Sequence, residues 1–160
     1  TMLHPAMAHF AVVLPIVAFI IGVRYLLKPN ESMSKVSTGY LAVASVFTVI
    51  AFFSGKADGE EVYILLSSEG MEVLKQHKDL GMYLAIGMVV ASVIKLFGTL
   101  KQNKKIETVA IVLVALLIAG TMYQGKLGGE LTYEHGAHVK NHSDGMDCLD
   151  DPEEFMDEEE

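Results

Sequence analysis

The stretch FAVVLPIVAFIIGV, residues 10–23, contains no polar side chain, and VAIVLVALLIAG, residues 109–120, repeats this property. A helix of a soluble bundle carries polar side chains along one face, whereas a helix that is apolar all round is buried in protein or in lipid. Crossing the hydrocarbon core of a bilayer takes about 20 mostly apolar residues. The two stretches therefore predict membrane-spanning helices and argue against a soluble four-helix bundle.

Four segments of the chain satisfy this length and hydrophobicity, and no segment predicts a strand. We expect the spans at residues 5–27, 36–53, 80–100 and 106–123. The predicted fold is all-α: an integral membrane four-helix bundle formed by residues 1–139, with residues 140–160 as a separate tail.

The charges within the predicted spans are few and lie near the span ends. We expect the long side chains of Arg24 and Lys95 to extend to the interface, and we expect no buried acid in any span. Gly55, Gly59 and Gly70 predict breaks between the second and third spans, with short amphipathic helices lying on the membrane surface.

Composition agrees with a membrane protein and limits its partners. Hydrophobic residues make up 51% of the 160 residues, and the formal net charge is −8. Ten of the 20 acids lie in residues 144–160, which predicts a solvated, disordered acidic tail. Nucleic acid is not an expected partner, because binding to phosphates requires basic patches. The lipid bilayer is the partner that the spans predict.

Basic residues are concentrated at two short connections, and they predict the topology. The connection between spans one and two and that between spans three and four, with the adjoining helix ends, hold seven of the 12 Lys and Arg residues. Basic residues flank the cytoplasmic ends of spans. We therefore expect both termini on the outer side, which is periplasmic for a multi-pass protein of a bacterial inner membrane.

All six histidines fall on that outer side once the chain is threaded through the bilayer. They are His4, His9, His77, His135, His138 and His142. Imidazole binds zinc, copper and iron, including haem iron. An ionisable side chain within a span, such as His9, indicates a functional site by default. The pattern predicts a cluster of metal or haem ligands. The alternative is a structural role, in which each ring only hydrogen-bonds a loop carbonyl.

Four short motifs resemble an uncharacterised family of four-helix membrane proteins, domain of unknown function 2231. The motifs are LHPAMAHF at 3–10, FFSGKAD at 52–58, QHKDLG at 76–81 and GKLGGELTYEHGAHV at 125–139. The first and last are fairly specific, and the resemblance extends over residues 3–139. It implies that the signature residues are His4, His9, Asp58, His77 and His135. It does not extend to His142, and His138 stands where a small residue is expected.

We consider three functions. The first is binding of haem b through His4, His9, His77 and His135, with His9 and His77 as the first pair, for electron transfer with a periplasmic or membrane redox protein. The second is a non-haem site for Zn, Cu or Fe that adds Asp58 or Glu61 to the same histidines. The third is a structural or accessory subunit of a larger membrane complex or homo-oligomer. In none of the three do we expect the chain to have a catalytic activity of its own.

Overall fold

The computed structural model describes residues 3–137 and is a bundle of four long helices. The predicted acidic tail, His138 and His142 lie outside the described residues. The helices are α1 (Leu3–Leu27), α2 (Glu31–Val62), α3 (Ser68–Leu100) and α4 (Lys104–Tyr133), and a short 3₁₀ turn, η1 (Tyr63–Leu65), follows α2. No strand occurs within residues 3–137, so the predicted all-α class is confirmed.

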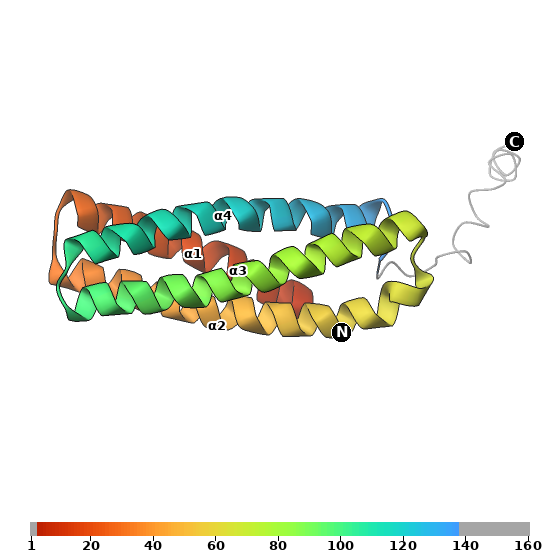
Figure 1. Cartoon of the computed structure of the whole chain (residues 1–160), viewed down its shortest axis with the longest axis horizontal. Coiled ribbons are helices and arrows are strands. Elements are labelled where there is room, and N and C mark those ends of the chain that lie inside the picture. The colour runs from red at the N-terminus through yellow and green to blue at the C-terminus, as the bar shows by residue number, and fades with distance from the viewer. Residues whose placement is uncertain (1–2, 138–160) are drawn as a thin grey trace, which may run out of the picture.

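The helices alternate in direction, and each packs against its two neighbours in a ring (Figure 1). The α1–α2 and α3–α4 connections lie at one end of the bundle, here called the short-loop end. The α2–α3 connection and the described end of α4 lie at the other end. The interface between α1 and α4 is the least extensive of the four.

Asparagine and serine side chains begin three of the helices. The carboxamide oxygen of Asn30 accepts from the backbone N–H of Ser32 at 2.8 Å, and that of Asn103 accepts from Lys105 N–H at 3.0 Å. Ser67 Oγ accepts from Gly70 N–H at 3.2 Å. Each cap satisfies a backbone donor that the first turn of a helix leaves unpaired, which fixes where the chain re-enters a helix.

The predicted glycine breaks are wrong. The helix α2 continues through Gly55 and Gly59, and α3 already includes Gly70. A glycine inside a helix costs only about 1 kcal/mol relative to alanine, and helix packing outweighs that cost here. The expected interfacial helices are therefore extensions of α2 and α3, joined by η1.

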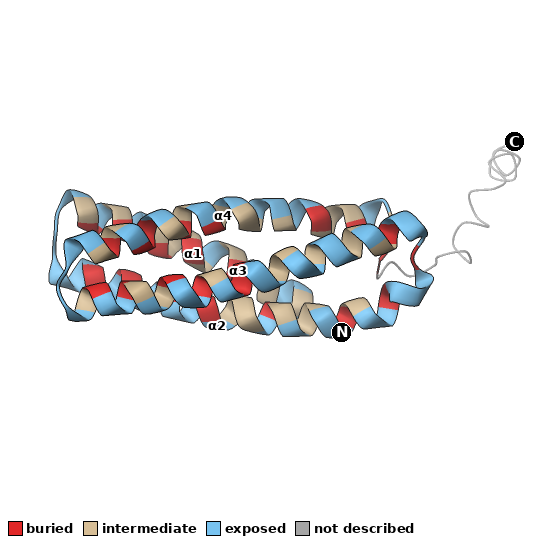
Figure 2. Ribbon diagram, viewed as in Figure 1, coloured by how far each residue is buried: buried red, intermediate tan, exposed pale blue. Residues whose placement is uncertain are grey.

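Buried positions follow the inner faces of the bundle (Figure 2). The outer faces carry large apolar side chains. All four helices are long and apolar enough to cross a membrane. Exposed apolar side chains such as Ile20 and Leu116, each more than 60% exposed, are suited to contact with lipid. The central core is formed by small and aliphatic residues, namely Ala18, Leu41, Leu84, Met88, Ala91, Val114 and Leu117.

Candidate functional site

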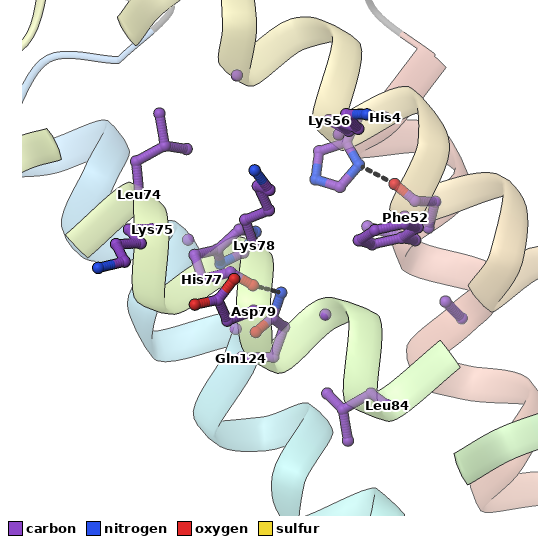
Figure 3. A pocket seen from close by; sticks show the side chains of 18 of the residues that line it. His4, Phe52, Lys56, Leu74, Lys75, His77, Lys78, Asp79, Leu84 and Gln124 are labelled. Carbon is purple, nitrogen blue, oxygen red and sulfur yellow. Dashed lines mark hydrogen bonds between the residues drawn. The ribbon is translucent and has the colours of Figure 1, made fainter. Parts of the chain in front are cut away.

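A cavity of about 840 Å³ lies between the four helices in the half of the bundle away from the short-loop end (Figure 3). Its volume is within the 300–1,000 Å³ that is typical of small-molecule and cofactor sites. Small residues on all four helices leave this space open, among them Ala8, Ala11, Gly55, Gly59, Gly81, Gly125 and Gly128. The cavity is thus a product of the sequence, because larger side chains at these positions would fill it.

His4 contributes one imidazole ring to the cavity from the first turn of α1. Its Nδ1 is 2.7 Å from the backbone oxygen of Ala51 on α2. Since a carbonyl only accepts, this contact places the proton on Nδ1 and leaves the lone pair on Nε2. Gly55 makes the position possible, because a Cβ there would lie 2.6 Å from His4 Cε1.

His77 contributes a second ring from α3, and the two rings lie close together. Their centroids are 6.3 Å apart and their planes are nearly perpendicular, at 86°. The Nδ1 atom of His77 is buried and has no hydrogen-bond partner among residues 3–137. Its Cε1 lies 3.3 Å from the place that a Cβ on Gly128 would take, so this edge of the ring faces α4. Nε2 is therefore the nitrogen of His77 that is left to meet a ligand.

The structure does not bring His9 or His135 to this cavity. His9 lies on an exposed face of α1, with its Nδ1 2.6 Å from the backbone oxygen of Pro5 in the preceding turn. His135 follows α4 and is half-buried against Gly70, where a Cβ would lie 3.2 Å from its Cβ. Of the four predicted histidines, His4 and His77 alone line the cavity.

Asp58, the predicted carboxylate ligand, is buried on α2 with 3% of its surface exposed and does not line the cavity. Within residues 3–137 no three His, Cys, Asp or Glu side chains are grouped closely enough to hold a metal ion. The described residues therefore offer a pair of imidazoles rather than a cluster of ligands.

Charged side chains surround the outer part of the cavity. Three lysines and three acids line it, namely Lys56, Lys75, Lys78, Glu60, Glu72 and Asp79. Lys56 and Glu60 form a loose pair at 4.0 Å. Lys75 and Lys78 have no ion-pair partner among the residues that the structure describes, so both ammonium groups remain available to an anionic group of a ligand.

A second polar cluster, which sequence reasoning missed, lies near the short-loop end. Lys95 Nζ is 2.6 Å from Glu107 Oε2, and both side chains are 1% exposed. The expectations that Lys95 extends to the interface and that no span holds a buried acid are therefore wrong. Ser34 Oγ donates to the same carboxylate oxygen at 2.7 Å, and Lys95 donates to Thr38 Oγ1 at 2.9 Å.

The signal for this cluster was present in the sequence. Ser34 and Thr38 are one helical turn apart on α2, and with Ser37 they form a buried polar stripe near the start of this helix. Polar residues inside a membrane bundle face one another and pair. The hydroxyl groups on α2 could therefore have been matched with Lys95 on α3 and Glu107 on α4.

Comparison with known proteins gives the family of the chain but no characterised relative. Neither a curated protein nor a solved structure matches it. The family model described as predicted membrane protein (DUF2231) matches residues 1–141. The protein therefore belongs to the DUF2231 family of predicted membrane proteins, as the four motifs indicated.

Proposed function

We propose that this membrane protein binds haem b in its four-helix cavity, where His4 and His77 would hold the iron, and that it serves in electron transfer. The observation that carries the proposal is the facing pair of imidazoles at the wall of a cofactor-sized cavity. Helical bundles commonly hold cofactors in this way, with side chains from facing helices. Bound haem iron would supply one-electron chemistry, and the chain would supply the ligands and an apolar enclosure.

The spacing of the two rings supports a shared metal. Imidazole nitrogens bind metals at about 2.0–2.1 Å, so two rings that would hold one metal have centroids no more than roughly 6 Å apart. The centroids of His4 and His77 are 6.3 Å apart. Both Nδ1 atoms are turned toward protein, which leaves both Nε2 atoms as potential ligands.

The donor set favours haem over a bare metal ion. A structural zinc site uses four protein ligands and a catalytic one uses three, and residues 3–137 provide no such group. Haem iron needs only one or two ligands from the protein, because the macrocycle provides the others. Lys75 and Lys78 at the cavity rim would pair with the two carboxylates of haem.

The predicted topology belongs to the same proposal. The basic residues at the short-loop end are exposed, namely Arg24, Lys28, Lys35, Lys101, Lys104 and Lys105. By the positive-inside rule this end faces the cytoplasm, so the cavity and both termini face the outside, or the periplasm in a bacterial inner membrane. A periplasmic or membrane redox protein would then exchange electrons with the site.

The test is the reduced-minus-oxidised visible spectrum of the protein purified from haem-replete cells. We expect a haem b spectrum in the wild type and its loss in His4→Ala and His77→Ala. His9→Ala and His135→Ala are matched controls, since neither ring lines the cavity, and both should keep the spectrum.

Two results would overturn the proposal. One is a wild-type protein without haem absorbance that also takes up no added haem. If His77→Ala then disrupts a larger assembly, an accessory subunit is the better description. The other is bound zinc, copper or non-haem iron at one equivalent in the same preparation, which would establish a metal-binding protein instead.

A further inference from the structure

We infer that Gln124 is a positioning residue for His77 in the haem-bound protein: its Oε1, which has no partner within residues 3–137 of the structure, would then accept a hydrogen bond from His77 Nδ1–H and direct the Nε2 lone pair of that ring to the iron. The inference rests on the proposed haem site. In this inference α4 contributes no ligand to the iron. Its residue Gln124 controls how the His77 ring is oriented and how strongly that ring donates electrons to the iron.

Gln124 reaches across from α4 to the helix that carries His77. Its Nε2 donates to the backbone oxygen of His77 at 2.8 Å. Gly81 gives the carboxamide room, because a Cβ there would lie 3.0 Å from Gln124 Nε2. This hydrogen bond holds the Nε2 end of the carboxamide. The Oε1 atom, which is an acceptor, takes no part in it.

Two buried polar atoms lack a partner within residues 3–137, and they are His77 Nδ1 and Gln124 Oε1. Buried polar atoms without partners are rare in native proteins, and each calls for an explanation. These two are complementary, because a protonated ring nitrogen donates and a carboxamide oxygen accepts. Both residues line the same cavity.

The two side chains also share one groove between α3 and α4. Gln124 and Gly128 are one turn apart on α4. The ring of His77 lies against Gly128, with Cε1 3.3 Å and Nδ1 3.8 Å from the position of a Cβ there. The Nδ1 edge therefore faces the turn of α4 that is next to Gln124, so the unpartnered donor and acceptor belong to side chains that meet in one groove.

His4 shows what such a contact does. Its Nδ1 is bound to the backbone oxygen of Ala51, which fixes the tautomer and leaves Nε2 as the ligand. Histidines that bind metals nearly always donate their other ring N–H to a carbonyl, a carboxylate or water. Within residues 3–137 no backbone carbonyl has this role for His77, and Gln124 Oε1, on the helix that its ring faces, is a buried acceptor without a partner.

The test compares Gln124→Met with Gln124→Glu in the full-length protein. Methionine has the length of glutamine and lacks both the donor and a strong acceptor, so haem affinity should fall about 10- to 100-fold and the midpoint potential should rise. Glutamate keeps an acceptor and adds charge, so it should retain more affinity than methionine and lower the potential. Affinity is measured by haem titration, and the potential by spectroelectrochemistry.

Gln76→Met is the matched control. Gln76 lies on α3 next to His77, is exposed and contacts Glu72 at 3.4 Å, outside the cavity. Its substitution should change neither quantity. Helical content measured by circular dichroism shows whether each variant folds. If Gln124→Met does not fold, the midpoint potential of Gln124→Glu decides: a lower potential supports the inference and a higher one overturns it.

Opposite shifts of the potential in the two variants support the inference. Shifts of the midpoint potential that are equal in sign and size would overturn it. Both substitutions remove the hydrogen bond from Gln124 Nε2 to the His77 carbonyl, so a residue that only held the two helices together would give the same result in both variants. A wild-type protein that binds no haem would overturn the proposed function as well. Haem binding that is indifferent to Gln124 would overturn this inference alone.

Discussion

The ring of His4 occupies space that exists only because residue 55 has no side chain. A Cβ on Gly55 would lie 2.6 Å from His4 Cε1 and 2.7 Å from Nδ1. We expect Gly55→Ala to displace the ring from Ala51 and to lower haem affinity about 10-fold or more, while the helix itself gains from the alanine. Haem titration alongside thermal unfolding measures both effects.

Gly39→Ala is the control for this substitution. Gly39 lies on the same helix and has no neighbour within 4 Å of an added Cβ. It should unfold at the same or a slightly higher temperature and bind haem as the wild type does. Unchanged affinity in Gly55→Ala would show that the position of His4 against Ala51 does not matter for the ligand.

The buried pair of Lys95 and Glu107 gives a second prediction for single residues. Removing one partner of a buried ion pair leaves an unpaired charge and costs about 3–5 kcal/mol, whereas removing both is often nearly neutral. We expect Lys95→Met and Glu107→Leu each to lower the free energy of unfolding strongly. The double variant should lose less than either single one, as measured by denaturation in mixed micelles. Additive losses would contradict the pairing.

These residues also show the limit of sequence reasoning at this scale. A lysine near a span end ordinarily extends to the interface, and nothing about Lys95 alone distinguishes it. Its burial requires Glu107 of α4 and the hydroxyl groups of Ser34 and Thr38 on α2 to lie at the same depth as Lys95. That arrangement is a property of the packing. In the same way, residues five apart such as His4 and His9 cannot share one helix face. Which of the two faces inward is settled only by the neighbouring helices.

At the scale of the elements, the α3–α4 turn depends on one close approach. A Cβ on Gly98 would lie 2.9 Å from the backbone nitrogen of Glu107, and backbone cannot move aside as a side chain can. We expect Gly98→Ala to destabilise the bundle by about 1–3 kcal/mol. The measurement is the unfolding free energy in micelles.

The comparison variant for the turn is Gly129→Ala, on α4. Nothing lies within 4 Å of an added Cβ there, so this variant should be at least as stable as the wild type. Equal stability of the two alanine variants would mean that the turn can relax and that the tight contact at Gly98 is not required.

The existence and number of the helices could be predicted from the sequence, and their lengths could not. Runs of apolar residues determine that four helices cross the bilayer, and all four are found. Hydropathy, however, detects only the part of a helix that lies in hydrocarbon. The extensions of α2 and α3 through Gly55, Gly59 and Gly70 are polar outside and packed inside, where Val62, Leu66 and Leu131 form a second small core. Such packing is not visible in a hydropathy pattern.

For the whole molecule, the topology can be tested with the chain's own single cysteine. If both termini are outside, a membrane-impermeant maleimide should label Cys148 in cells whose outer membrane has been made permeable. In a Cys148→Ser background, Lys104→Cys at the short-loop end should stay unlabelled until the inner membrane is broken. The reverse pattern would invert the topology and place the cavity on the cytoplasmic side.

The candidate site itself was only partly predictable. The alternation of the helices brings His4, His9, His77 and His135 toward one end of the bundle, so the end could be inferred from chain order alone. The pairing could not, because it depends on the small residues that open the cavity and on Ala51 and Gly128, which orient the two rings. Sequence reasoning put His9 first, whereas the structure brings His4 to His77.

The depth of the cavity has a consequence for energy conversion. Leu100, at the short-loop end of α3, follows His77 by 23 residues, which at 1.5 Å per residue is about 35 Å of helix. The hydrocarbon core is about 30 Å thick, so if Leu100 lies at one edge of the core, His77 lies at the level of the opposite headgroups. If the proposed haem is bound there, an electron that enters and leaves it on that side crosses none of the transmembrane voltage. Redox turnover by this protein alone would therefore be electroneutral, and its rate would not respond to the membrane potential.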